Sequence, residues 1–329
     1  MEELSKTILV TGGCGFIGTH LCHALVNAGQ KVRILDDLSS GKAAGIPESA
    51  DLIVGDVADA EAVADAMAGV DGVIHLAAIA SVELCNKAWV RSHRTNLTGT
   101  LTVMEAARDA ANPALPVVWA SSAAIYGAAR TLPINERTVP APMSPYGADK
   151  LGGEQHGLAA ADIFGVANTA LRFFNVYGPG QDPHSPYSGV ISIFAERLGS
   201  GRDITINGDG QQTRDFVYVG DVVRALMASL DRLQRRRRLD QPASFDAINV
   251  CTGHAVTVST LAETLRTLTG STASIAYGPP RDGDIRDSVG DASKMQRLLG
   301  LRAETSLRDG LQALIETPDA ISRMETGTG

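Results

Sequence analysis

Features that mark several protein classes are scarce or missing in this chain of 329 residues. Its four cysteines show neither the CxxC spacing of a metal or redox site nor a paired pattern. We therefore expect free thiols in a reducing, cytoplasmic environment. His20 and His23 share a predicted helix face, but nothing else with ligand spacing lies near them in the sequence. No metal site is predicted.

Long apolar runs are also missing. No stretch approaches the roughly 20 apolar residues of a membrane-spanning helix. The acidic N-terminus enters a strand at once and does not resemble a signal peptide. The net charge of −8 argues against nucleic acid as the main partner. Apolar residues make up 44% of the sequence, which is enough for the core of one large or two modest domains.

The N-terminal segment carries a glycine-rich turn between a strand and a helix. The apolar strand Lys6–Thr11 runs into GGCGFIG and then into an amphipathic stretch. Three glycines spaced GxxGxxG permit a tight turn and the close approach of a pyrophosphate, and the helix that follows points its first N–H groups at that anion. We therefore predict dinucleotide binding here. The predicted contacts are Gly12, Gly15, Phe16, Ile17 and Gly18.

A second strand, Lys31–Leu35, ends in Asp36 and Asp37 at the distance from the glycine turn that a ribose-binding acid requires. An acidic side chain there binds the ribose hydroxyls and repels a 2′-phosphate, which favours NAD over NADP. The alternative is that Asp36 is only a loop carboxylate. Asp56 and Val57 follow the next strand, where an adenine could be held.

Strands and helices alternate through the first half of the chain. Gly72–Leu76 is a further strand, and it runs into Ala77 and Ala78, whose small side chains allow a cofactor to lie close to the backbone. A helix is expected over Asn96–Ala111. This βαβα series predicts an α/β fold with a doubly wound parallel sheet, and ligands at the carboxyl ends of its strands.

The stretch Pro116–Lys150 holds the candidate catalytic residues. A buried strand is expected to end on Ser122, and Tyr146 and Lys150 lie one helical turn apart on the same face of the next helix. Because a nearby ammonium favours an ionised phenol, we expect Lys150 to lower the pKa of Tyr146 and to make it a general base. A serine and a YxxxK pattern are often structural when seen alone, and Ser121 is the alternative to Ser122.

The pattern changes near Asn175, where loops rich in Pro, Ser and Gly begin. Four consecutive arginines within Gln234–Leu239 are interpreted as a solvated loop rather than as a nucleic-acid patch. The expected organisation is a nucleotide-binding domain over residues 1–175, rejoined by about 219–252, a smaller mixed α/β substrate domain over 176–218 and 253–316, and a flexible tail over 317–329.

Taken together, the motifs resemble the extended short-chain dehydrogenases/reductases that act on nucleotide sugars. Matching segments run in family order between residues 7 and 295, among them TGGCGFIG, LDDLSSG, HLAA, TNLTGT, SSAAIYG, YGADK, RFFNVYGPGQ and GDGQQTRDFVYV. Within the family the pattern looks most like that of UDP-hexose 4-epimerases, particularly those that accept N-acetylated sugars. The resemblance implies a Rossmann fold, bound NAD, and epimerisation at C4 of UDP-glucose or UDP-N-acetylglucosamine through a 4-keto sugar.

The resemblance also implies roles for single residues. Tyr146 would be the base, Lys150 would hold the nicotinamide ribose, and Ser122 would hydrogen-bond the reacting sugar oxygen. Arg214 and Arg281 would neutralise the diphosphate. The other implied cofactor contacts are Asp36, Asp37, Asp56, Val57, Leu76, Ala77, Ala78 and Asn96. The other implied substrate contacts are Ser81, Asn175, Val190, Thr205, Asn207, Asp284 and Ser288.

Departures from related patterns narrow the reaction. Ala123 and Ala124 stand where related dehydratases carry an acid after the catalytic Ser or Thr. Asn175 stands where uronate 4-epimerases usually carry Thr, which favours a neutral sugar. Ser288 replaces a bulky aromatic of some relatives and leaves room beside C2 of the sugar. Ala80 replaces a lysine of some hexose epimerases, so one contact to sugar or phosphate is absent or supplied otherwise.

Alternatives to the epimerase are another nucleotide-sugar enzyme (a uronate epimerase, a dehydratase or a reductase with net redox turnover) and, more remotely, a non-catalytic NAD-binding scaffold. The retained Tyr146 and Lys150 pair argues against the scaffold. Enzymes of this kind are commonly homodimers, joined through helices equivalent to 96–111 and 146–164. The resemblance therefore implies a second copy of this chain as a partner, although the alanines of the second helix could equally face the core.

Overall fold

The computed structural model describes residues 5–111, 113–183, 189–281 and 283–317, and the chain divides into two compact units. All but the first residue of the predicted tail 317–329 lies outside the described residues. Unit 1 consists of Met1–Ile125, Ser144–Arg172 and Val223–Ile248. Unit 2 consists of Tyr126–Met143, Phe173–Val222 and Asn249–Gly329.

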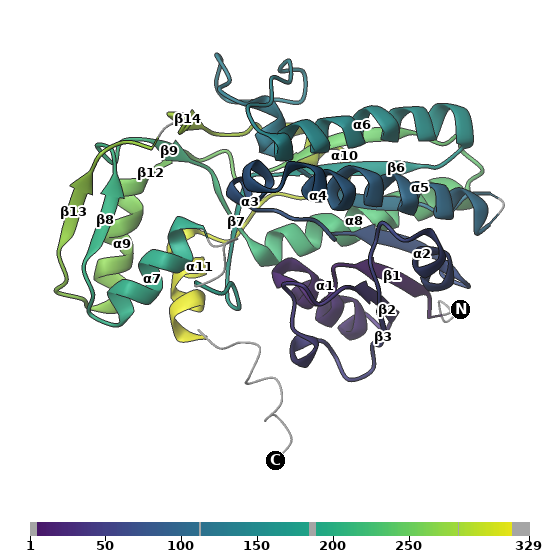
Figure 1. Ribbon diagram of the computed structural model, residues 1–329, viewed down its shortest axis with the longest axis horizontal. Coiled ribbons are helices and arrows are strands. Elements are labelled where there is room, and N and C mark those ends of the chain that lie inside the picture. Colours follow the sequence, from purple (N-terminus) through teal and green to yellow (C-terminus); the bar gives the residue numbers. More distant parts are fainter. Residues whose placement is uncertain (1–4, 112, 184–188, 282, 318–329) are drawn as a thin grey trace. The chain divides into compact units, whose positions relative to one another are not determined.

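A seven-stranded sheet forms the centre of unit 1, with the strand order β11-β6-β5-β4-β1-β2-β3 (Figure 1). The pairs β1–β2, β1–β4, β2–β3 and β4–β5 are all parallel. The strand order reverses between β1 and β4, which is the switch point where folds of this kind bind ligands. The strands are β1 (Thr7–Thr11), β2 (Lys31–Asp36), β3 (Asp51–Val54), β4 (Gly72–His75), β5 (Val117–Ser122), β6 (Asn168–Phe173) and β11 (Phe245–Val250).

Helices cover both faces of this sheet, as the alternation of elements predicts. On one face, Leu9, Val73 and Trp119 share a core with apolar residues of α2, α5 and α6. On the other face, Leu230 of α8 packs close to Gly72. The doubly wound α/β architecture is thereby confirmed. Its helices are α1 (Phe16–Asn27), α2 (Ala60–Met67), α5 (Gly99–Asp109), α6 (Pro145–Phe164) and α8 (Val219–Arg238), with a short 3₁₀ turn η1 (Ala43–Gly45) after β2 and another, η3 (Ala123–Tyr126), after β5.

One prediction in this part of the chain is wrong, and a predicted helix differs at its start. The four arginines expected in a loop form the last turn of α8, because arginine is a good helix former and its charge is favourable at a helix C-terminus. The helix expected from Asn96 begins earlier and irregularly. It is preceded by α3 (Val82–Lys87) and α4 (Trp89–His93), and it enters α5 through η2, a π-helical turn over Arg94–Thr98.

Unit 2 is a smaller mixed α/β structure, as predicted. Its core gathers side chains from α7, α9, α11 and β8, including Phe194, Ile206, Leu261 and Leu311. Parallel pairs join β7 (Asn175–Tyr177) to β10 (Phe216–Tyr218) and β8 (Ile204–Asn207) to β13 (Ile275–Gly278), while β9 (Thr213–Arg214) lies between β12 (Val256–Thr257) and β14 (Asp287–Ser288). The helices are α7 (Val190–Gly199), α9 (Val258–Thr269), α10 (Ser293–Leu299) and α11 (Leu307–Glu316).

Residues Tyr126–Met143 belong to unit 2, whereas the sequence analysis placed them in the first domain. Ile134 forms a β-bridge with Gly290, and its carbonyl accepts a hydrogen bond of 2.9 Å from Asn249 Nδ2. Tyr126 donates a hydrogen bond of 2.7 Å to the same asparagine. These partners are more than 100 residues apart in the chain, so no local pattern indicates them. Across the described ranges, no helix has both the length and the apolar character needed to cross a membrane.

Candidate active site

A tight glycine turn links β1 to α1. Gly12 has a φ of +71°, and a Cβ atom on it would lie 2.6 Å from the backbone nitrogen of Ala77. A Cβ atom on Gly18 would lie 2.2 Å from the carbonyl oxygen of Gly12. α1 begins at Phe16, and no side chain of the described residues caps its first N–H groups. The turn therefore presents open N–H groups at a helix N-terminus, which suits a pyrophosphate.

Asp36 lies beside this turn at the end of β2. Its Oδ2 accepts a hydrogen bond of 3.0 Å from the Cys14 N–H, and its Oδ1 accepts one of 2.9 Å from the Leu38 N–H. Burial raises the pKa of the carboxyl, and the two backbone hydrogen bonds oppose that rise. Each oxygen keeps a second lone pair for a hydroxyl group. The glycine turn and the acid together fit the phosphates and a ribose of a dinucleotide.

The segment after β4 runs alongside the glycine turn. Leu76 donates a backbone hydrogen bond of 2.9 Å to Thr11, and Ala77 donates one of 3.3 Å to the Thr11 hydroxyl. Asn96 accepts a hydrogen bond of 2.8 Å from the Ile79 N–H and donates one of 3.1 Å to the Ile79 carbonyl. Asn96 is only 1% exposed, so it acts on this segment by holding its backbone.

Two other predicted cofactor contacts follow β3. Asp56 accepts a hydrogen bond of 2.8 Å from the Ala58 N–H and forms an ion pair of 2.5 Å with Arg94. Val57 is buried, with 4% of its surface exposed. Asp37, at the end of β2, is exposed and accepts a hydrogen bond of 2.9 Å from the Ser39 N–H. The structure therefore gives Asp37 a partner in its own loop and Asp56 a further partner in η2, while Val57 is part of the core.

The three predicted catalytic residues come together at the end of β5 and the start of α6. β5 ends on Ser122, whose hydroxyl accepts a hydrogen bond of 3.1 Å from the Ala124 N–H and lowers the pKa of Tyr146. α6 begins at Pro145, and the hydroxyl of Ser144 caps it by accepting a hydrogen bond of 3.1 Å from the Gly147 N–H. Lys150 Nζ lies 5.8 Å from the centroid of the Tyr146 ring. This geometry brings a hydroxyl, a phenol and an ammonium to the carboxyl end of the sheet.

Burial dominates the electrostatics of this group. It raises the pKa of Tyr146 to about 12, and the Ser122 hydroxyl offsets part of that rise. Burial likewise lowers the pKa of Lys150 to about 8, while the Asp149 carboxylate acts in the opposite direction. The direction for Tyr146 is opposite to the sequence-based expectation, because removal of the phenolate from water outweighs the nearby ammonium. A phenolate at neutral pH requires further positive charge in the site.

A buried ion pair that the sequence analysis missed lies one turn beyond Lys150. Glu154 accepts hydrogen bonds of 2.9 and 2.5 Å from Arg172 and one of 2.6 Å from the Ser121 hydroxyl. Glu154 is 3% exposed and Arg172 is 6% exposed. Because Ser121 is committed to Glu154, Ser122 is the serine available to Tyr146. The i, i+4 spacing places Glu154 on the same helix face as Lys150, but no local pattern indicates its partner Arg172 on β6.

In unit 2, the side chain of Asn175 is held by the backbone of Asp215, whose own carboxylate is buried. Its side-chain amide donates a hydrogen bond of 3.1 Å to the Asp215 carbonyl. The Asp215 carboxylate, fully buried, accepts backbone hydrogen bonds of 2.8 to 3.2 Å from Thr252, Gly253 and Gly290. Asp215 was not predicted as a functional residue. Its carboxylate anchors the Asp215 backbone, and the carbonyl of that backbone holds the Asn175 side chain.

The predicted diphosphate and nucleoside contacts of unit 2 are only partly brought together. Arg214 donates a hydrogen bond of 2.5 Å to Asp284, and it is the register partner of Ser288 in the β9–β14 pair. Arg281 is exposed. The three residues predicted to line the nucleotide slot belong to α7 and β8. Val190 starts α7, Thr205 is exposed between two buried isoleucines of β8, and Asn207 ends that strand.

Residues 8–250 match the NAD dependent epimerase/dehydratase family. The chain belongs to this family. It is 34% identical to a UDP-glucose 4-epimerase of Mycolicibacterium smegmatis, over 94% of this chain and 97% of that protein. A structure of a UDP-glucose 4-epimerase from Thermotoga maritima with UDP-glucose shares 36% identity, with a TM-score of 0.87, over 94% of this chain and 98% of that one.

A UDP-N-acetylglucosamine 4-epimerase from Methanobrevibacter ruminantium, solved with UDP-N-acetylmuramic acid, is similar to the same degree. Its TM-score is 0.87 and its identity is 32%, over 95% of this chain and 97% of that one. Within the NAD dependent epimerase/dehydratase family, the chain therefore falls in the class of nucleotide-sugar 4-epimerases. The class is NAD-dependent, in agreement with the glycine turn and Asp36.

Ser81, predicted as a sugar contact, lies at the start of α3. Its hydroxyl accepts a hydrogen bond of 3.2 Å from the Leu84 N–H and so caps α3, and the residue is 6% exposed. The structure therefore gives Ser81 a structural partner in place of an open position facing a sugar. No group of three His, Cys, Asp or Glu side chains that could hold a metal occurs among the described residues.

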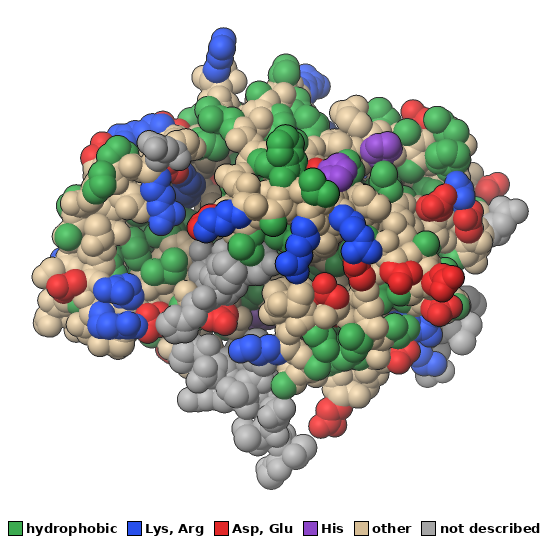
Figure 2. Space-filling model, viewed as in Figure 1, with side chains coloured by type: hydrophobic (Ala, Val, Ile, Leu, Met, Phe, Trp, Pro, Cys, Tyr) green, Lys and Arg blue, Asp and Glu red, His purple; other side chains and the backbone are tan. Residues whose placement is uncertain are grey.

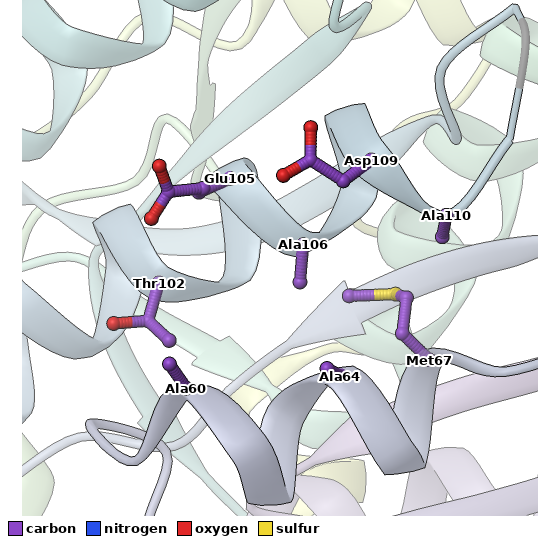
Figure 3. A pocket seen from close by; sticks show the side chains of 8 residues that line it. All are labelled: Ala60, Ala64, Met67, Thr102, Glu105, Ala106, Asp109 and Ala110. Carbon is purple, nitrogen blue, oxygen red and sulfur yellow. The ribbon is translucent and has the colours of Figure 1, made fainter.

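A groove of about 330 Å³ lies away from all of these residues, between α2 and α5 (Figure 3). Ala64, Met67 and Ala106 form its floor, and Glu105 and Asp109 stand at its rim. Both carboxylates pair with Arg108, at 3.4 and 2.6 Å. Acidic side chains gather over these helices on the face shown in Figure 2. None of the predicted site residues lines the groove.

Proposed function

We propose that this enzyme interconverts the C4 epimers of a neutral UDP-hexose, with UDP-glucose and UDP-N-acetylglucosamine as its substrates. The observation that carries the proposal is the convergence of Ser122, Tyr146 and Lys150 at the carboxyl end of β5. A phenol suited to act as a general base, a serine hydroxyl and a buried ammonium meet there, close in the fold to a glycine turn suited to a dinucleotide.

Tyr146 is the residue assigned to accept the proton of the sugar's C4 hydroxyl. The Ser122 hydroxyl lies near enough to Tyr146 to lower its pKa, so both would bind the oxygen at C4, and Tyr146 would accept its proton as the carbonyl forms. NAD, when bound, supplies a reversible hydride acceptor and, in its oxidised form, a positive charge. Lys150 supplies a second charge beside the phenol. Loss of the C4 hydrogen as hydride while the carbonyl forms, and its return to the opposite face of the flat carbonyl carbon together with the proton from Tyr146, would invert C4 with no net redox.

The rest of the substrate is assigned to unit 2. Arg214 and Arg281 would neutralise the diphosphate, and Asp284 would bind near the nucleoside ribose. The pairing of Arg214 with Asp284 supports this, because it holds a guanidinium and a carboxylate in a defined geometry. Asn175, fixed through Asp215, would contact the sugar diphosphate. Val190, Thr205 and Asn207 would line the nucleotide slot.

The substrate range is assigned from small side chains. Ala123 and Ala124 follow Ser122 with no acid to move a second proton, which favours epimerisation over dehydration. Ser288 replaces a bulky aromatic and so leaves room for an N-acetyl group at C2. Its placement in register with Arg214 supports a position beside the bound sugar nucleotide.

We also propose that the enzyme acts in the cytoplasm as a homodimer joined through α5 and α6. Apolar side chains over α4 and α6 support a partner there (Figure 2). Val90 is 83% exposed, Ile163 is 71% exposed and Phe164 is 51% exposed. By contrast, Ala160 and Ala161 lie in the core of unit 1, so they do not form the contact surface suggested by the sequence.

The test is to incubate the purified enzyme with UDP-glucose and UDP-N-acetylglucosamine in turn, with and without added NAD, and to resolve the products by anion-exchange chromatography and NMR. We expect the C4 epimers to form without net NADH. Tyr146→Phe should lower kcat by about a thousandfold or more, because it removes the general base. Asp162→Asn, at an exposed position of α6, should keep full activity. Accumulation of NADH would instead indicate a dehydrogenase.

A further inference from the structure

Asp149 and His93 form a hydrogen-bonded pair that the proposed reaction does not use. Asp149 Oδ1 lies 2.7 Å from His93 Nδ1, and the two residues belong to α6 and α4. The Asp149 side chain is 6% exposed, whereas that of His93 is 48% exposed. A nearly buried carboxylate is therefore held by a partner that reaches the surface of unit 1.

The hydrogen bonds of Asp149 are incomplete. Its Oδ2 is buried and has no hydrogen-bond partner among the described residues. A buried carboxylate with one unused oxygen is unfavourable unless a positive charge nearby offsets the loss of hydration. Lys150 is the next residue in the chain and is itself 2% exposed. The Asp149 carboxylate therefore offsets part of the desolvation of the Lys150 ammonium.

The other titratable groups that act on Lys150 come from three elements. Tyr146 shares α6, Cys85 lies on α3, and His75 ends β4. Burial raises the pKa of the Cys85 thiol and lowers the pKa of His75 to about 3, so both are uncharged at neutral pH. His75 is satisfied by hydroxyls at 2.7 and 3.0 Å. In this set, the negative charge acting on Lys150 comes from Asp149.

We propose that Asp149 is a positioning residue for the reaction, whose carboxylate, held by His93, keeps the Lys150 side chain charged and directed toward Tyr146. The proposal rests on the role of Lys150 in the proposed function. Burial alone lowers the pKa of Lys150 toward the neutral range, and the carboxylate limits that fall. The hydrogen bond with His93 fixes the position of the Asp149 carboxylate.

The direct test measures the charge of Lys150 without any reaction. The chain has only six lysines, so selective ¹³C and ¹⁵N labelling of lysine gives few signals, and Lys150→Met identifies the one that belongs to position 150. In the purified full-length protein, Asp149→Asn should lower the pKa of Lys150 by roughly one pH unit. Asp162→Asn makes the same charge change at an exposed position of the same helix and should leave that pKa unchanged.

His93→Gln separates the charge of Asp149 from its placement. Glutamine can still donate a hydrogen bond, and the Asp149 charge remains, so the pKa of Lys150 should shift less than in Asp149→Asn. Circular dichroism and thermal unfolding establish that each variant is folded. A Lys150 pKa in Asp149→Asn equal to that of the wild type overturns the proposal, even if activity falls, because the effect would then be only structural.

Kinetics give the second readout. With UDP-glucose as substrate, the alkaline decline of kcat should move to lower pH in Asp149→Asn by the same amount as the Lys150 pKa, with KM little changed. A uniform loss of kcat at every pH would contradict the proposal. If the wild type proves inactive on both sugars, the proposed function fails. The NMR titration still decides whether Asp149 keeps Lys150 charged.

Discussion

The Cβ atom that Gly12 lacks would lie 2.6 Å from the backbone nitrogen of Ala77, at the end of the neighbouring strand. Neither backbone can give way without moving the turn or the sheet. We therefore expect Gly12→Ala to weaken NAD binding at least tenfold and to destabilise unit 1, because it adds a backbone clash to the strain of φ +71°. Calorimetric titration with NAD measures the first effect and thermal unfolding the second.

Gly29→Ala is the matched control for that substitution. Gly29 has a φ of +77°, and no described residue places an atom within 4 Å of its missing Cβ atom. It shares the strain of Gly12 without the clash, and it should cost roughly 1 kcal/mol of stability while leaving NAD affinity unchanged. Equal loss of NAD binding in the two variants would mean that the turn does not hold the cofactor.

We expect the buried charge of Lys150 to lower the stability of the folded protein, although the reaction requires that charge. Its pKa falls from an ordinary 10.5 to about 8 in the folded protein, a difference worth up to about 3 kcal/mol against folding. Lys150→Met should therefore abolish epimerisation and stabilise the ligand-free protein by about 1 to 3 kcal/mol at pH 7. Denaturant unfolding with an assay of turnover tests both effects.

The pH dependence of that stabilisation follows from the sign of the shift. Below pH 8 the lysine is charged in both states, so the full penalty acts on the folded wild type. Between pH 8 and 10.5 the unfolded chain binds the proton and the folded one does not, so wild-type stability rises with pH. The advantage of Lys150→Met should shrink across that range. An advantage that stays constant would mean that it comes from packing.

The Glu154 and Arg172 pair predicts a strongly asymmetric mutational response. Glu154→Gln leaves the buried guanidinium without its carboxylate and should cost about 3 kcal/mol or more. The double variant Glu154→Leu with Arg172→Met should be less destabilised than the sum of its single variants, because it removes both charges together. A double-mutant cycle by denaturant unfolding measures this coupling. Additive losses would show that the two charges do not stabilise each other.

Ser288 predicts the choice between sugars. Ser288→Tyr should lower kcat/KM for UDP-N-acetylglucosamine by about a hundredfold, roughly 2.7 kcal/mol, while sparing UDP-glucose, because the ring would fill the space beside C2. Ser288→Thr adds only a methyl group and should keep both activities. A comparable loss on both sugars would remove Ser288 from the list of specificity residues.

Local chemistry made much of the fold predictable. β1 and the glycine turn are contiguous in sequence, and Tyr146 and Lys150 are four residues apart, so their placement needs no long-range information. Asp215 and Asn249 hold loops that are distant in the sequence, and no pattern indicates such partners. The pKa of Tyr146 was expected to fall because the sequence shows the neighbouring charge, whereas its burial depends on the whole unit.

Predictions for charged segments failed for a related reason. The arginines that end α8 were interpreted as a loop because of their charge, although their helix propensity and the helix dipole favour the helix. Trp89 and the short helices around it lie in a stretch that lacks a clear helical period. The π-helical turn Arg94–Thr98 has no sequence signature that we could have used.

Each unit is assembled from three separate stretches of the chain, and the stretches alternate along it. No single cut in the chain releases either unit intact. A cut at one boundary leaves the two units linked through the remaining boundaries. A single recombination between two related genes therefore cannot exchange the whole of unit 2 while keeping unit 1. Point substitutions leave every stretch of both units in its own context, and we expect Ser288 to be one place where a single codon changes the substrate preference.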